Sequence, residues 1–136
     1  MQKKPLSLSM FDTVAACNKG VEFELDTPDG SPSGIFWTVL GRDSDAFREY
    51  DQDAKNERNR RAQMAFRSGK PLQMDSAQVE EQKQVDLLCV LSTGWRNMPD
   101  NVAFSVPACR DVLTKYPHIR RQVDAFIGDI GNFMKG

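Results

Sequence analysis

The hydrophobic pattern near the start of the chain has a two-residue repeat. Residues 21–25 alternate apolar and acidic side chains, which is typical of a strand with one exposed face. Residues 35–40 are β-branched or aromatic, and residues 26–34 between the two runs hold two prolines, two glycines and two aspartates. A turn-rich stretch between two strand-forming runs predicts a β-hairpin over residues 20–41.

After residue 43 the pattern favours helices. Residues 46–66 contain no glycine or proline and follow capping side chains at 43–45, so they predict one long helix. Its centre is almost wholly polar, which indicates a helix exposed to solvent or to a partner. A second helix is predicted over residues 77–92, and its apolar stretch 85–91 is the best candidate for a central buried helix.

Two further helices are expected near the end of the chain. Ser105 caps a short one that ends at Tyr116 and Pro117. The last helix then carries apolar side chains at steps of three and four over four turns: Ile119, Val123, Phe126, Ile127, Ile130, Phe133 and Met134. Such a stripe usually faces a core, and a broad one also leaves an outer edge for an interface.

Strands followed by helices predict an α+β, helix-dominated fold with an N-terminal β-hairpin and about four helices. The length of 136 residues fits a single domain, 1–136, with a hairpin at 20–41 and a helical part at 43–136. Residues 1–19 give no clear element. The chain has no apolar run of ~18 residues and no continuous apolar leader, so neither a membrane span nor a signal peptide is expected.

Charge and cysteine content narrow the range of partners. Charged residues make up 27% of the chain, both signs are mixed, and the net charge is −1, so no overall attraction to nucleic acid or to an anionic membrane is expected. The three cysteines are far apart and form no C-x-x-C pair. Free thiols in a reducing cytoplasm are therefore expected.

No residue pattern points to catalysis. The single histidine, His118, has no cysteine or carboxylate at ligand spacing, so we interpret it as a surface residue at a helix start. Cys89 and Cys109 lie in apolar stripes and are expected to be buried structural thiols. Nucleophile-elbow, P-loop and dinucleotide fingerprints do not occur. We therefore predict a protein that is not an enzyme and needs no metal or cofactor.

One basic cluster lies in and just beyond the long helix: Arg58, Arg60, Arg61, Arg67 and Lys70. A phosphate-contacting helix is one interpretation. Carboxylates stand four residues before several basic side chains, as Glu57 does before Arg61, and aromatic residues for base stacking are missing from the cluster. A solvated, self-paired face is therefore favoured over nucleic-acid binding.

Two stretches together resemble the tail assembly chaperones of long-tailed bacteriophages with flexible, non-contractile tails. The first is residues 39–49, Val-Leu-Gly-Arg-Asp-Ser-Asp-Ala-Phe-Arg-Glu, where a strand runs into a charged helix. The second combines Trp95, a polar turn, Phe104-Ser105, a short helix, Tyr116-Pro117 and a terminal helix ending at Asn132-Phe133. That turn often carries a glycine in the family, whereas Asp100 and Asn101 occupy it here.

The resemblance implies a function without covalent chemistry. Such proteins self-associate, often as a spiral, and coat the tape measure protein, keeping it soluble in the host cell cytoplasm until the tail tube polymerises. A longer, frameshifted form recruits the tail tube protein, and the chaperone is absent from the mature virion. The expected client-binding residues are large apolar side chains near and along the terminal helix: Trp95, Phe104, Phe126, Ile130 and Phe133.

Two alternatives fit the same sequence. A small head–tail joining or other tail structural protein would share the size and the α+β composition, but it would stay in the particle. A nucleic-acid-binding regulator would use the basic cluster, and its binding would depend strongly on salt.

Overall fold

The sheet has three antiparallel strands in the order β1–β2–β3. The structure is a computed structural model, and it describes residues 6–135. The strands are β1 (Val21–Asp26), β2 (Pro32–Val39) and β3 (Ser92–Arg96). The first two form the predicted hairpin, so that prediction is confirmed.

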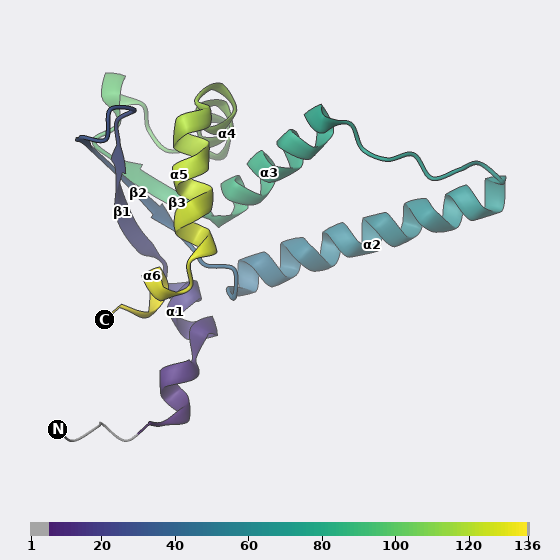
Figure 1. Cartoon of the computed structure of the whole chain (residues 1–136), viewed down its shortest axis with the longest axis horizontal. Helices are drawn as coiled ribbons and strands as arrows, with labels where there is room; N and C mark the ends of the chain where they lie inside the picture. Colours follow the sequence, from purple (N-terminus) through teal and green to yellow (C-terminus); the bar gives the residue numbers. More distant parts are fainter. Residues whose placement is uncertain (1–5, 136) are drawn as a thin grey trace.

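Helices account for most of the remaining chain (Figure 1). They are η1 (Leu8–Phe11), α1 (Thr13–Lys19), α2 (Asp45–Ser68), α3 (Ala77–Leu91), η2 (Pro99–Asn101), α4 (Val106–Lys115), α5 (Pro117–Gly128) and α6 (Gly131–Met134). The predicted helix-dominated α+β fold is therefore confirmed. The segment 1–19, which the sequence left open, contains η1 and α1 from residue 8 onward, while residues 1–5 lie outside the described range.

The third strand was not predicted. The sequence placed residue 92 in the second helix and residues 93–95 in a loop, whereas the chain passes directly from α3 into β3. Trp95 lies opposite Trp37 in the β2–β3 ladder, with ring centroids 5.0 Å apart. A five-residue strand containing Gly94 carries no alternating pattern of its own, so its conformation depends on pairing with β2.

The last helix is also shorter than predicted. Instead of four continuous turns, α5 ends at Gly128 and the backbone of Asp129 is extended before α6 begins. The Asp129 carboxylate accepts a hydrogen bond from the Gly131 amide at 3.0 Å, and the Asn132 side chain donates to the Phe126 carbonyl at 3.0 Å. These bonds fix a bend that turns Phe133 inward.

A buried tryptophan lies where the sheet meets the helices. Trp37 is fully buried, and its Nε1 donates to the Ser92 hydroxyl at 2.9 Å. That hydroxyl donates in turn to the Leu88 carbonyl at 2.7 Å. The surrounding core consists of Cys17, Leu25, Val39, Val85, Leu88, Cys89, Leu91, Cys109, Leu113, Val123, Ile127 and Phe133. Among the described residues, no buried side-chain nitrogen or oxygen lacks a partner.

Close backbone packing explains one glycine. Gly41 follows β2 and is buried against Cys17 of α1, where its amide donates to the Cys17 carbonyl at 3.2 Å. A Cβ atom at this position would overlap the Cys17 thiol and press on the ring of Phe133. Glycine therefore lets α1 and α6 pack together beneath the strand exit.

Two residues of the turn before α4 have a left-handed backbone. Asp100 and Asn101 have φ values of 63° and 54°, in the left-handed region. Asparagine and aspartate tolerate this region better than other non-glycine residues, because their short polar side chains bond locally. Asp100 and Asn101 therefore adopt a turn conformation that glycine also allows.

The central helix α3 and the long helix α2 differ in burial, and this difference predicts different effects of substitutions on stability. Leu88 is fully buried, whereas α2 contains no buried residue. We predict that Leu88→Ala lowers the free energy of unfolding by ~2–5 kcal/mol, because it leaves a cavity. Arg58→Ala, on exposed α2, should change it by no more than roughly 0.5 kcal/mol. Urea melts measure both, and equal midpoints for the two variants would contradict this assignment of the core.

Candidate protein-binding surface

The most prominent surface feature is an arm formed by α2, the connector of residues 69–76 and the first half of α3. Figure 1 shows α2 projecting away from the sheet and the connector leading the chain back to α3. With 24 residues, α2 is about 36 Å long at 1.5 Å per residue. All the buried residues of α3 belong to its second half, from Val85 onward. The outer part of the arm therefore lies outside the core.

The base of the arm is fixed to the rest of the protein. Ser44 is buried and caps α2 by accepting a hydrogen bond from the Phe47 amide at 3.2 Å. Asn18 of α1 accepts from the Asp45 amide at 2.8 Å and donates to the Asp45 carboxylate at 3.0 Å. Tyr50 then donates to the Lys83 carbonyl of α3 at 3.3 Å. These contacts set the direction in which α2 leaves the body.

Large apolar side chains are exposed at the far end of the arm, which we call the arm tip. Gly69, in the left-handed conformation, ends α2, and no helix or strand covers residues 69–76. The exposed side chains are Met64 (57%), Phe66 (89%), Leu72 (55%) and Met74 (95%). Four such residues within eleven positions exceed the scattered exposure that is ordinary on a protein surface.

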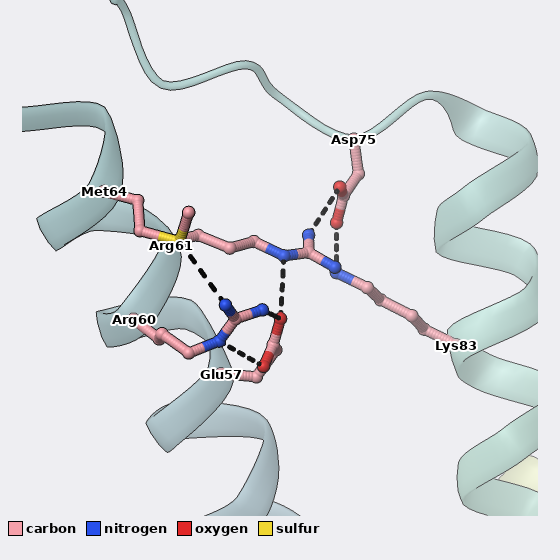
Figure 2. A network of polar contacts seen from close by, with 6 residues as sticks. All are labelled: Glu57, Arg60, Arg61, Met64, Asp75 and Lys83. Atoms are coloured by element: carbon pink, nitrogen blue, oxygen red, sulfur yellow. Dashed lines mark hydrogen bonds and ion pairs between the residues drawn. The ribbon is translucent and has the colours of Figure 1, made fainter. Parts of the chain in front are cut away.

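Ion pairs connect the two sides of the arm (Figure 2). Asp75 of the connector contacts Lys83 of α3 and lies 3.6 Å from Arg61 of α2. Within α2, Glu57 contacts Arg60 at 2.7 Å and Arg61 at 3.4 Å. Asp75 therefore joins the connector to both helices, close to the exposed apolar residues.

The cations beside these carboxylates change their acidity. A hydrogen bond from Lys83, and then the nearby charges of Lys83 and Arg61, hold the pKa of Asp75 below its usual value. Hydrogen bonding to Arg60 lowers the pKa of Glu57 in the same way. Both carboxylates therefore stay ionised to a lower pH than unpaired ones would.

A cleft of about 540 Å³ lies between the helices of the arm. Tyr50, Ala54, Leu72 and Met74 supply its apolar lining. Its charged lining is balanced, with three acidic and three basic side chains: Glu57, Asp75, Glu80, Arg58, Arg61 and Lys83. The cleft therefore offers apolar contact without a strong electrostatic preference.

The predicted self-pairing of the basic cluster is confirmed for the central arginines. Arg60 and Arg61 both contact Glu57, and Lys55 pairs with Asp51 at 2.9 Å. Pairs of this type at three- or four-residue spacing on one helix face keep a polar helix soluble.

The five residues selected from the sequence do not form one exposed surface. Trp95 is half-buried between Trp37 and Phe104, and its Nε1 donates to the Val102 carbonyl at 2.9 Å. Phe104 is half-buried beside it, with ring centroids 4.9 Å apart. Both rings therefore help to hold the turn before α4 against the sheet.

The other three candidates lie around the end of α5. Phe126 is half-buried and stacks on Phe23 of β1, with centroids 4.1 Å apart. Phe133 is only 5% exposed, so its predicted position on an outer edge is wrong, because the bend at Asp129 directs it into the core. Ile130, at 41%, is the one candidate whose side chain is largely accessible.

The side chains that the sequence offered as candidates for chemistry, His118, Cys89 and Cys109, make structural contacts. His118 Nε2 lies 3.1 Å from the Asp26 carbonyl, which Gln122 also reaches at 3.0 Å, so both side chains join α5 to the end of β1. Cys89 and Cys109 are buried as predicted, and a hydrogen bond between their thiols lowers the pKa of Cys89 and raises that of Cys109.

Within residues 6–135, no three histidine, cysteine or acidic side chains are grouped to hold a metal ion. In the same range, no helix has the length and apolar character needed to cross a membrane.

The arm tip was missed by reasoning from the sequence. The sequence offers Phe66 as a possible core-facing residue of the long helix and gives no role to Met64, Leu72 or Met74, which lie beside the helix stop at residues 68–71. The available signal was their position: large apolar residues follow a polar helix but do not continue its periodicity. Without a helical or strand repeat, such residues have no predicted core to face.

The Asp75 contacts lead to a prediction about arm mobility. Asp75→Asn should speed amide hydrogen exchange at the end of α2 and the start of α3 and leave α4 and α5 unchanged, because it removes the charge that joins the connector to both helices. Since folding lowers the pKa of Asp75 from 3.8, this contribution is complete above about pH 4 and is lost as pH falls through the lower folded value. Asp53→Asn, on the exposed side of α2, is the control. Equal exchange rates in parent and Asp75→Asn would contradict the assignment.

Comparison with protein-family models, with curated proteins and with solved structures finds no match. No relative therefore supplies a function by likeness of fold, and the function has to be argued from the surface itself.

Proposed function

We propose that this protein is a phage tail assembly chaperone. In this function it self-associates in the host cytoplasm, binds the tape measure protein and keeps it soluble until the tail tube polymerises. The tail tube protein is a further partner, recruited through a longer, frameshifted form, and the chaperone leaves before the virion is complete. The sequence resemblance is the ground for this proposal, and the exposed arm tip is the observation that supports the binding mechanism.

The composition of the arm tip suits a client with an irregular apolar surface. Two of its four exposed side chains, Met64 and Met74, are unbranched thioethers that adapt to different partner shapes. Flexible, methionine-rich surfaces are typical of proteins that bind several sequences. A long helical client presents many different apolar segments, and one such surface can contact all of them.

The arm also explains how a free chaperone stays soluble. Paired charges surround the apolar side chains, with Arg60 and Arg61 held by Glu57 and Lys83 held by Asp75. These charges separate the arm tip from the rest of α2, which is polar along its length. A small apolar patch in charged surroundings favours weak contacts over irreversible association.

Weak binding at each arm agrees with the need for release. Several chaperones bound along one client raise the overall affinity through effective concentration, although each contact alone is easily broken. Tube subunits can then replace the chaperones one at a time. Client binding through the core would require unfolding, whereas binding through the arm leaves the folded body intact.

The arm tip can be tested against the surface selected from the sequence. We predict that the double variant Phe66→Asp and Met74→Asp folds like the parent, because both side chains are exposed. Co-expressed with the tape measure protein, it should leave as much client insoluble as in the absence of the chaperone. The comparison variant Ile130→Asp adds one such charge at the exposed residue selected from the sequence and should keep the client soluble. The soluble fraction of client measures both.

The opposite pattern would contradict this assignment. If Ile130→Asp loses the client while the arm-tip variant retains it, the terminal helix carries the binding surface. If a folded arm-tip variant and Ile130→Asp both hold the client like the parent, neither surface takes part.

A further inference from the structure

A second apolar segment is exposed at the other end of the molecule from the η2 turn. Residues 6–11 include four large apolar side chains, and η1 contains no buried residue. Their exposed fractions are 77% for Leu6, 88% for Leu8, 50% for Met10 and 66% for Phe11. We call this the N-terminal segment. These apolar side chains do not take part in the core, so they are accessible to a partner.

The geometry of η1 gives this segment a defined apolar side. In a 3₁₀ helix, residues three apart lie one above the other. Leu8 and Phe11 are therefore on the same side of η1. The Ser7 hydroxyl bonds to that of Ser9 at 2.8 Å, and Asp12 caps α1 immediately afterwards.

An apolar cleft lies beside the η2 turn, and we call it the η2 cleft. It has a volume of about 230 Å³ and is lined by apolar side chains from β2, the η2 turn, α4 and α5, among them Ile35, Met98, Val102, Val112 and Ile119. Tyr116, at 47% exposed, and Val102, at 41%, make it accessible from solvent. An apolar cavity of roughly 150 Å³ accommodates a benzene ring, so the cleft has room for the side chain of Phe11.

The positions of the two features favour contact between copies. Figure 1 shows η1 beside α1, near the marked N-terminus, whereas the η2 turn that follows β3 lies at the opposite end of the sheet. Within one molecule, the sheet and α5 therefore lie between the segment and the cleft. A second copy brings its own N-terminal segment to the cleft without any change in fold.

Charge favours the η2 cleft over the arm cleft as the partner of this segment. Two lysines, Lys3 and Lys4, precede the segment in the sequence. Among the described residues that line the η2 cleft, Asp100 is the only charged one. The arm cleft carries equal numbers of acidic and basic side chains and therefore gives no such complementarity.

We propose that the N-terminal segment of one copy docks in the η2 cleft of a second copy, with Leu8 and Phe11 as its apolar anchors. The two contacting surfaces differ, so each copy keeps one free segment and one free cleft. A contact of this kind produces a ring when the rotation closes and an open chain when it does not. The inference rests on the self-association included in the proposed function, but its test uses this protein alone.

Two variants isolate the two halves of the contact. Leu8→Asp removes an anchor, and Val102→Lys places a long charged side chain in the cleft. Ser9→Asp and Thr114→Lys are the matched controls, because they add the same charges at exposed polar positions. Circular dichroism checks that all four variants fold, and Tyr116→Lys replaces Val102→Lys if the latter does not fold.

Sedimentation velocity over a range of concentrations gives a distinctive expected result. The parent and both controls form assemblies larger than a dimer at high concentration, whereas Leu8→Asp and Val102→Lys each remain monomeric. Mixed in equal amounts, the two monomeric variants form a dimer and nothing larger, because only one intact segment and one intact cleft can meet. Asp100→Asn keeps the left-handed turn and should weaken association by up to about five-fold at low salt.

Three outcomes would overturn the proposal. They are a parent that stays monomeric at all concentrations, folded variants that assemble like the parent, and a mixture of the two monomeric variants that forms no dimer. The double variant Phe66→Asp and Met74→Asp should still self-associate. Loss of client binding and loss of self-association are therefore separate results, and each proposal can fail without the other.

Discussion

The junction between the sheet and the helices depends on the burial of Trp37 with a hydrogen bond to its indole nitrogen. Leaving that donor unpaired in the core would cost about 1–3 kcal/mol, so the Ser92 hydroxyl has to lie within reach of it. Ser92 is both the end of α3 and the start of β3, and its hydroxyl also bonds to Leu88. One contact thus fixes the third strand against β2 and the base of α3 against the sheet.

This arrangement divides the chain into a packed body and an exposed arm. The second half of α3 belongs to the core, and helices α4 and α5 pack around it. The first half of α3, the connector and all of α2 contain no buried residue, because the buried part of α3 begins at Val85. The outer part of the arm can therefore contact a partner without disturbing the packing that holds the fold together. Such a division suits a protein that has to bind a client and later release it.

Local patterns in the sequence were enough to predict the hairpin, the long helix and the helix of residues 77–92, because periodicity and capping act over a few residues. β3 and the bend at Asp129 were missed for the opposite reason. The strand depends on pairing with residues more than fifty positions away, and the bend on side-chain bonds within a sequence that still has helical spacing. The same bend moved Phe133 from a predicted surface into the core. The arm tip lacks any periodicity, so only its position in the fold reveals it.

We propose that the client contacts the arm tip while the folded body remains unchanged. Amide hydrogen exchange, measured on the free protein and on its complex with the tape measure protein, tests this most directly. If the arm tip binds the client, residues 62–76 exchange more slowly in the complex and exchange in the core of α5 is unchanged. Slower exchange over residues 117–134, with residues 62–76 unaffected, would contradict it.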